Sequence, residues 1–321
     1  MLAVVLALAA AIGYGGSDFA AGLASRSAPV IQITLLASAV SVVIVAAALP
    51  FAVSPGPSAA ALAWGFGAGL GGTMGAFALY LGFRHAAFSV AAPLSAVASA
   101  GFSVLAGLLY GERPTTLALT GIVLALPAIV GVSASAAAEV EAEAEAPPSE
   151  ALPSEALPSE ALPSEALPSG AIAGGRPAAG GRPAAGVVYG LVAGAFFALL
   201  FIGLDRAGSG SGLWPVAAAA VGEVAAALVA AVAVRSFRLC GGRARLLAVI
   251  TGVTGAVGTI LFFLATHQGF LAVTAVLTSL YPAVTIVLAR VVLGERLTAL
   301  RLAGLGLAGV CVSLIAVGGA S

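Results

Sequence analysis

The chain has 321 residues, of which 61% are hydrophobic and only 8% are charged; 13 basic and 13 acidic side chains give a formal net charge of zero. Soluble domains carry about 25% charged residues, so this composition excludes a soluble enzyme, a disordered protein and a nucleic-acid-binding protein. It is typical of a protein that crosses a membrane several times.

Apolar segments of membrane-spanning length recur along the whole chain. A bilayer core requires about 20 predominantly apolar residues per helix. Ten segments meet this requirement, and they are residues 2–23, 30–52, 59–82, 89–109, 116–134, 187–205, 213–234, 246–266, 272–293 and 299–317. We expect each to be helical, because lipid offers no partner for an unpaired backbone group.

Residues 135–186 differ from the apolar segments on either side. Pro-Ser-Glu-Ala-Leu occurs four times in succession from Pro148 to Leu167, and eight of the 13 acids lie in this region. Such a stretch has almost nothing to bury. We therefore expect an acidic low-complexity linker between two units, residues 1–134 and residues 187–321. It is interpreted as a spacer, with a tether or docking tail as the alternative.

The two units are related by an offset of 183 residues. This offset superimposes the Gly-Glu-Arg sequence at 111–113 on that at 294–296, and it superimposes Thr115 on Thr298. Each unit then holds five helices, and an odd number makes the second unit enter the membrane inverted. The predicted fold is an all-α integral membrane protein with ten transmembrane helices in two inverted five-helix repeats.

This arrangement resembles a known transporter family. Two five-helix halves whose fourth span ends in Gly-Glu-Arg are similar to EamA-type members of the drug/metabolite transporter superfamily, as are the stretches 15–22 and 278–298. The resemblance implies a secondary transporter that exports small metabolites, amino acids or drug-like compounds by alternating access. It also implies that the third and ninth spans line the cavity and that the seventh lies away from it.

Two acids are expected inside the bilayer, where each costs at least about 2.5 kcal/mol at a helix centre. Glu223 lies in the middle of the seventh span, where it either carries a proton or is a hydrogen-bonded structural residue. Asp18 lies nearer the end of the first span, one helical turn after Tyr14. This pair either binds a cationic or amine group, relays a proton, or is hydrated at the membrane surface.

Further candidates follow from the resemblance. Tyr80 and Tyr281 lie on the spans that it implies line the cavity, and Ser95 and Thr278 could add hydrogen bonds there. The cavity inferred in this way is poor in polar residues, which favours an amphipathic or apolar substrate.

Both copies of Gly-Glu-Arg are expected at helix ends on opposite faces of the membrane. We expect their charged side chains to pair locally and to help close a gate on each face. These side chains are Glu112, Arg113, Glu295 and Arg296. Thr115 and Thr298 follow, and threonine at such a place caps the next helix.

No nucleotide-binding loop, catalytic constellation or metal-ligand spacing occurs in the sequence, so we expect no enzyme activity, no metal site and no cofactor. The expected partners are the lipid bilayer and a small-molecule substrate. Protons are a possible coupling ion, and no nucleic-acid partner is expected. A monomer and a homodimer both fit. The alternatives are an uncoupled facilitator or lipid-intermediate flippase on the same scaffold, and a membrane scaffold or sensor that acts through the linker.

The expected location is the bacterial plasma membrane, in a multi-pass arrangement, but two arguments on orientation disagree. The resemblance implies that both termini are cytoplasmic. Arginines, however, are concentrated in loops on the side of the connection between the first and second spans. The positive-inside rule places that side in the cytoplasm and both termini outside, and we favour this second orientation.

Overall fold

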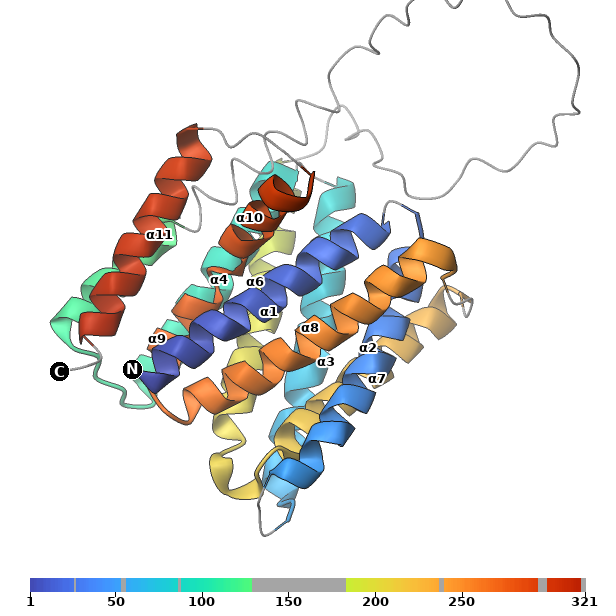
Figure 1. The fold of residues 1–321 in the computed structure, drawn as a ribbon, viewed down its shortest axis with the longest axis horizontal. Coiled ribbons are helices and arrows are strands. Elements are labelled where there is room, and N and C mark those ends of the chain that lie inside the picture. The colour runs from blue at the N-terminus through green and yellow to red at the C-terminus, as the bar shows by residue number, and fades with distance from the viewer. Residues whose placement is uncertain are drawn as a thin grey trace, which may run out of the picture.

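The computed structural model describes residues 1–25, 27–52, 56–85, 88–128, 183–236, 240–293 and 299–318. All regular secondary structure in these ranges is helical (Figure 1). The helices are α1 (Leu2–Ser25), α2 (Val30–Ala48), α3 (Ala59–His85), α4 (Phe88–Leu109), Thr116–Ala128, α6 (Pro183–Arg206), α7 (Trp214–Ala233), α8 (Gly242–Thr266), α9 (Leu271–Thr278), α10 (Tyr281–Leu293) and α11 (Ala299–Gly318). Within these ranges, six helices are long and apolar enough to cross a bilayer, and several shorter ones are also apolar.

Two predicted boundaries are wrong. The ninth span was expected to be one helix over 272–293, but it is divided into α9 and α10. The break precedes Pro282, whose ring nitrogen cannot donate a hydrogen bond to the preceding turn. The linker was expected to extend to residue 186, but α6 begins at Pro183. Proline is well suited to a first helical position, where a backbone N–H has no helical acceptor.

The contacts between helices are repeated under the 183-residue offset. α1 packs along α8, and the corresponding pair, α6 and α3, also packs together. In the same way α2 contacts α8 as α7 contacts α3, and α4 contacts α6 as α10 contacts α1. The helices of the two halves are therefore interleaved in one bundle (Figure 1).

The direction of the helices defines two ends of the bundle. The Ser58 N–H donates to Ser211 Oγ at 3.1 Å, so the connections α2–α3 and α6–α7 lie at the same end. α1 runs away from this end and α6 runs toward it. We call it the clasp end, because Glu112 also lies there. The opposite end, at which α1 joins α2 and α7 joins α8, carries Arg235, Arg243 and Arg245 and is called the arginine end.

Glycine allows the helix backbones to approach closely. A Cβ added to Gly13 in α1 would lie 2.8 Å from Gly258 Cα in α8. In α3, Cβ atoms on Gly65 and Gly69 would collide with the backbone of α7. The glycine-rich string in this helix is therefore packing material, as expected for membrane helices with small residues at their contacts.

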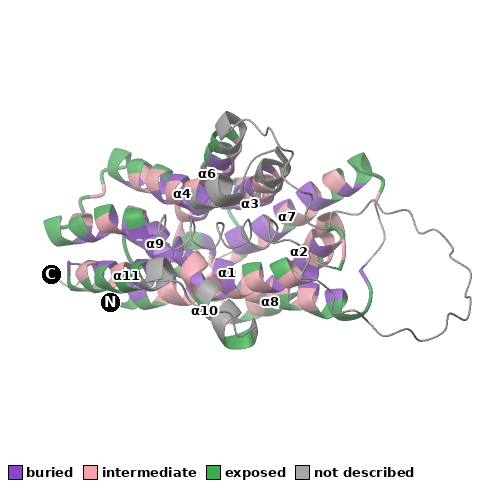
Figure 2. Cartoon of the chain, turned by 90° about the horizontal axis from the view of Figure 1, so that it is seen from above, coloured by how far each residue is buried: buried purple, intermediate pink, exposed green. Residues whose placement is uncertain are grey.

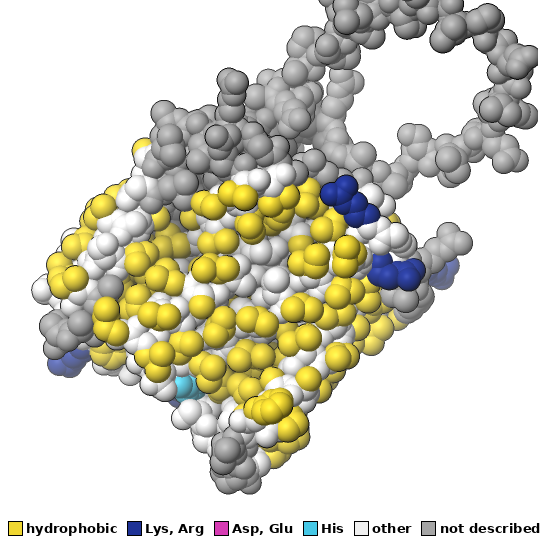
Figure 3. All heavy atoms as spheres, in the orientation of Figure 1, with side chains coloured by type: hydrophobic (Ala, Val, Ile, Leu, Met, Phe, Trp, Pro, Cys, Tyr) yellow, Lys and Arg dark blue, Asp and Glu magenta, His cyan; other side chains and the backbone are white. Residues whose placement is uncertain are grey.

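Apolar side chains cover the outside of the bundle. On the face drawn in Figure 3, hydrophobic side chains occupy the broad middle region and arginines lie at its margins. Buried residues follow the inward faces of the helices, and exposed ones lie outward and at the ends (Figure 2). Such a surface suits a hydrocarbon environment, which confirms that the chain is a membrane protein.

Candidate functional site

A cavity of about 260 Å³ lies inside the bundle. Helices α1, α2, α3, α6 and α8 contribute most of its lining, and α4, α7 and α10 contribute one residue each. It extends from Tyr14 and Glu223 in the middle of the bundle to Ser25 and Val30 at the arginine end. Asp18 lies between these limits, seven residues before the end of α1, or about 10 Å along the helix axis.

One face of α1 forms a continuous wall of the cavity. Tyr14, Ser17, Asp18, Ala21 and Ser25 all line it, and their spacing of three and four residues places them on one side of the helix. The helix is continuous from residue 2 to residue 25, and Gly13 and Gly15 beside this wall pack closely against α8 and α10.

Hydrogen bonds fix the orientation of the α1 side chains. The Tyr14 hydroxyl donates to Thr259 Oγ1 at 3.1 Å, and its ring centroid lies 6.4 Å from that of Phe201. The Ser17 hydroxyl donates to the Thr251 carbonyl oxygen at 3.1 Å. Both bonds reach α8, which the contact of Gly13 with Gly258 brings close to α1. The close backbone approach therefore positions the phenol.

Glu223 on α7 lines the same cavity as Asp18. Its side chain is half-buried, and Ser41 on α2 hydrogen-bonds to its carboxyl group. The expectation that the seventh helix lies away from the cavity is wrong here. A Cβ on Gly222 would lie 2.5 Å from the Phe66 carbonyl oxygen, and Gly69 of α3 contacts the same helix. These small residues allow α7 to pack closely against α3, so the carboxyl group of Glu223, next to Gly222, reaches the cavity.

Of the other predicted binding residues, one lines the cavity, two do not, and the side chain of one is not described. Tyr281 lines the cavity. Ser95 and Thr278 are fully buried in helix packing and are not among its lining residues; the Thr278 hydroxyl donates to the Ala7 carbonyl oxygen at 3.3 Å. The side chain of Tyr80 lies outside the described residues.

The cavity lining holds more hydroxyl residues than the sequence predicted, although its exposed surface is mostly apolar. The additional hydroxyl residues are Ser17, Ser25, Thr34, Ser38, Ser41, Thr73, Ser99, Thr251 and Thr259. A usable signal existed in two helices: Thr34, Ser38 and Ser41 in α2, and Thr251 and Thr259 in α8, recur with helical spacing within apolar segments.

The clasp end is closed by a contact between the two halves of the chain. Glu112 Oε1 accepts the Leu271 N–H at 2.5 Å, and Oε2 accepts the Ala272 N–H at 2.9 Å. These are the first two residues of α9, whose own N-cap, Phe270, makes no side-chain hydrogen bond to the helix. An acid at a helix N-terminus satisfies free N–H groups and interacts favourably with the helix dipole.

The Gly-Glu-Arg sequence makes this contact possible. Gly111 has φ of +90°, a conformation that glycine adopts without strain, and it ends α4 so that Glu112 turns toward α9. A Cβ on Gly107 would collide with the Glu112 carboxyl group, so a larger residue there would displace this group from the start of α9. The expected local ion pair is replaced by this cap: Glu112 pairs with backbone N–H groups rather than with Arg113.

Thr115 confirms its predicted capping role. Its hydroxyl oxygen accepts the Ala118 N–H at 3.3 Å, at the start of the helix Thr116–Ala128. The same hydroxyl donates to the Gly318 carbonyl oxygen at 2.8 Å and joins this helix to α11. The second copy of the motif, including Glu295, Arg296 and Thr298, lies outside the described residues.

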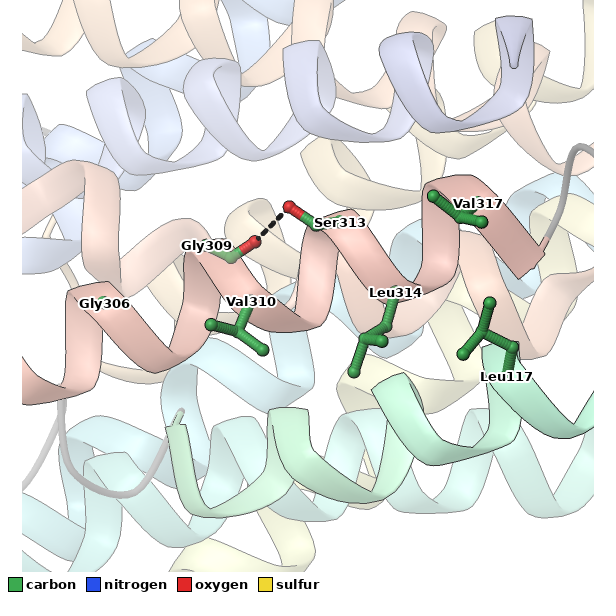
Figure 4. Close-up of a pocket in the computed structure, with 7 residues that line it drawn as sticks. All are labelled: Leu117, Gly306, Gly309, Val310, Ser313, Leu314 and Val317. Carbon is green, nitrogen blue, oxygen red and sulfur yellow. Dashed lines mark hydrogen bonds between the residues drawn. The ribbon is translucent and has the colours of Figure 1, made fainter.

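A second hollow lies on the outer surface between α11 and the helix Thr116–Ala128 (Figure 4). Its lining is Leu117, Gly306, Gly309, Val310, Ser313, Leu314 and Val317, none of which is charged. The Ser313 hydroxyl donates to the Gly309 carbonyl oxygen of its own helix at 2.9 Å. This groove has little with which to orient a polar ligand, so the central cavity is the candidate site.

Comparison with solved structures supports the fold. A crystal structure of a protein with 15% sequence identity superimposes with a TM-score of 0.70, covering 99% of this chain and 97% of the other. At this identity the likeness concerns the fold alone. No functionally curated protein matches the sequence.

The sequence also matches a family model twice, over residues 1–134 and 184–317. The second match begins 183 residues after the first, which is the offset that relates the two Gly-Glu-Arg sequences. Together the matches cover most of the chain and leave out the repetitive segment between them. The chain belongs to the EamA-like transporter family and is a multi-pass membrane transporter of the drug/metabolite transporter superfamily.

Proposed function

We propose that the protein is a secondary transporter of the bacterial plasma membrane that exports small metabolites or drug-like compounds by alternating access. One observation carries this proposal: a cavity with two carboxyl groups reaches the arginine end, while the clasp end is closed. A cavity open toward one end and closed at the other is one of the two states that alternating access requires.

The proposal assigns ten spans to two inverted repeats. Support comes from the opposite directions of α1 and α6 and from the helix contacts that recur under the 183-residue offset. In such a design the substrate site lies at the interface of the repeats near the midplane. The cavity supports this placement, because residues of both halves line it together: α1, α2 and α3 from one half, and α6, α7 and α8 from the other.

Apolar packing and the Glu112 cap would both change during transport. Between the cavity and the clasp end, the space is filled by buried side chains of α9 and its neighbours. These include Leu271, Val276 and Leu277. Opening this end requires α4 and α9 to separate, which would break the hydrogen bonds of Glu112 to the first turn of α9. The cap therefore stabilises the closed clasp end.

The proposed energy source is exchange of protons against substrate. Asp18 and Glu223 are carboxyl groups within the membrane region, and such groups occur in the proton relays of pumps and transporters. Both line one cavity, so a proton and a substrate would compete for them. The arginine end faces the cytoplasm by the positive-inside rule, so the cavity as observed would take up substrate there for export.

The test combines substrate discovery with reconstitution. Untargeted metabolite analysis of an overexpressing strain and a deletion strain gives the exported compound, which is then assayed in proteoliposomes with and without an imposed pH gradient. Asp18→Asn and Glu223→Gln should each lower gradient-driven transport at least tenfold. Glu150→Gln removes an acid of the repetitive segment outside the two five-helix units, and it should leave transport unchanged.

Two outcomes would overturn the proposal or part of it. If no compound differs in amount between the two strains and none is transported in proteoliposomes, the proposal that the protein is an exporter is wrong. If both cavity variants keep the wild-type rate and the wild-type response to the pH gradient, the proton-exchange step is wrong and an uncoupled facilitator on the same scaffold replaces it.

A further inference from the structure

The two carboxyl groups of the central cavity have no cationic partner among its described lining residues, which include no arginine and no histidine. Asp18 is exposed to the cavity and makes no hydrogen bond or ion pair with any described residue. Glu223 interacts with the Ser41 hydroxyl, which is neutral. Acids inside a membrane protein ordinarily pair with one another or with a cation. A cationic ligand could therefore supply the positive charge that the described lining does not provide.

Most hydroxyl groups around these acids, with Ser41 as the exception, already donate their proton to another group of the protein. The Tyr14 hydroxyl donates to Thr259, and the Thr259 hydroxyl donates to the Gly255 carbonyl oxygen at 3.1 Å. Other hydroxyls donate to carbonyl oxygens, and they are those of Ser17, Ser25, Ser38, Ser99 and Thr251. A hydroxyl has one proton to donate and two lone pairs that accept. These oxygens therefore offer lone pairs to a ligand.

A cavity rich in acceptors selects ligands that donate. An ammonium group has N–H donors and no acceptor, so it fits both the carboxyl groups and the hydroxyl oxygens. A carboxylate or phosphate would meet lone pairs and two acids, and the described lining residues include no arginine to pair with it; the sequence contains no lysine. Burial of an unpaired charge is strongly unfavourable, so anions and zwitterions are disfavoured.

Aromatic rings and the size of the cavity restrict the ligand further. Tyr14, Phe197, Phe201 and Tyr281 line the cavity. Aromatic faces attract cations and bury the apolar part of an amphipathic molecule. The volume of about 260 Å³ is below the range of about 300–1,000 Å³ typical of sites for drug-sized ligands. The fitting ligand is small.

We propose that the central cavity is a binding site for small organic amines in their cationic form, with an apolar body and no carboxylate. Glu223 holds the ammonium group in the middle of the bundle, and Asp18 holds it nearer the arginine end. This inference rests on the proposed transport function and narrows its substrates to amines, excluding free amino acids.

A charge series with one common body tests the inference. The probes are 2-phenylethylamine, phenylalanine and 3-phenylpropionate, which are a cation, a zwitterion and an anion at neutral pH. Binding to the purified full-length protein in detergent is measured by calorimetry and by the rise in melting temperature. We expect saturable binding of the amine, with at least tenfold weaker binding of the other two.

Variants of the two acids test whether the carboxyl groups bind the amine, and controls exclude loss of binding through misfolding. Glu223→Gln and Asp18→Asn should each weaken amine binding at least tenfold, and the double variant should abolish it. Glu150→Gln, in the repetitive segment, should bind like the wild type. A monodisperse size-exclusion profile of each variant shows that the protein is folded. Equal or tighter binding of phenylalanine or 3-phenylpropionate, no binding of the amine, or full amine binding by the folded double variant would overturn the inference.

Transport measurements distinguish failure of this inference from failure of the proposed function. Amine binding without transport in proteoliposomes would leave the site standing and refute export. Export of an anion or a zwitterion that is insensitive to 2-phenylethylamine would leave the transporter standing and refute the amine site.

Discussion

Glu112 stabilises a helix that belongs to the other half of the chain. Its carboxyl group accepts the first two N–H groups of α9, and Gly107 leaves the space that this group occupies. Hydrogen bonds to charged groups contribute about 1.5–3 kcal/mol each on average. The contact is therefore large enough to influence which end of the bundle is open.

Glu112→Ala should destabilise the closed clasp end by about 2–3 kcal/mol, because the start of α9 loses both acceptors. The measurement is the rate at which a thiol reagent modifies Thr274→Cys, a position that is fully buried in α9, with Cys240 and Cys311 replaced by alanine. Modification should become faster by tenfold or more.

Gly107→Ala should reproduce this effect, since its Cβ would displace the carboxyl group. Gly101→Ala is the matched control on the same helix, because a Cβ there meets nothing within 4 Å. An unchanged modification rate in Glu112→Ala, or an equal increase in Gly101→Ala, would contradict the role assigned to the cap.

At the scale of elements, close contacts between helices bring the functional side chains together. α1 meets α8 at Gly13 and Gly258, and α3 meets α7 along Gly65 and Gly69. Without a hydrophobic force between helices in lipid, such packing contacts stabilise the bundle. They also fix the distance of Glu223 from the helices opposite.

Gly69→Ala should lower the melting temperature of the detergent-solubilised protein by several degrees and reduce transport, because its Cβ would collide with the Ala219 backbone. Overpacking of this kind typically costs about 1–3 kcal/mol. Gly67→Ala in the same helix meets nothing within 4 Å and should be neutral or slightly stabilising. Equal behaviour of the two variants would show that the α3–α7 contact does not limit stability.

At the scale of the whole molecule, the two halves form one bundle although a long repetitive segment separates them in sequence. Residues 128 and 183 both belong to the arginine end, so a short connection could join them. The described helices on either side of this segment contact one another directly.

Deletion of residues 138–182 should therefore leave expression and transport within twofold of the wild type. The deletion stops before Pro183 because α6 begins there. Transport in proteoliposomes is the measurement, and a linker of the same length composed of glycine and serine is the control. Loss of activity in both variants would favour the scaffold or sensor alternative, in which the acidic repeats recruit a partner.

The orientation of the whole molecule in the membrane can also be predicted. Arg235, Arg243 and Arg245 lie at the arginine end, and both termini belong to the clasp end. By the positive-inside rule, an alkaline phosphatase fused after Ser321 should be active and a green fluorescent protein should be dark. The opposite pair of results would place the termini in the cytoplasm and reverse the direction in which the observed cavity faces.

The sequence alone established the class of the molecule. Its scarcity of charge and its apolar segments report how each piece partitions into lipid, which is a local property. The offset between the two Gly-Glu-Arg sequences indicated the duplication and the family, and the unusual acids Asp18 and Glu223 marked candidate sites. Each of these conclusions required only composition, spacing or the presence of a rare residue type.

Only the tertiary structure decided which of these residues meet. Asp18 and Glu223 line one cavity, whereas Ser95 and Thr278, the further candidates that the resemblance suggested, are buried in helix packing. Glu112 caps a helix that begins 159 residues later in the chain. Apart from the spaced hydroxyl residues of α2 and α8, the apolar helices are hydrophobic on every face, so periodicity does not reveal which face points inward. Glycine contacts between distant backbones set the helix crossings, and the crossings determine which side chains enter the cavity.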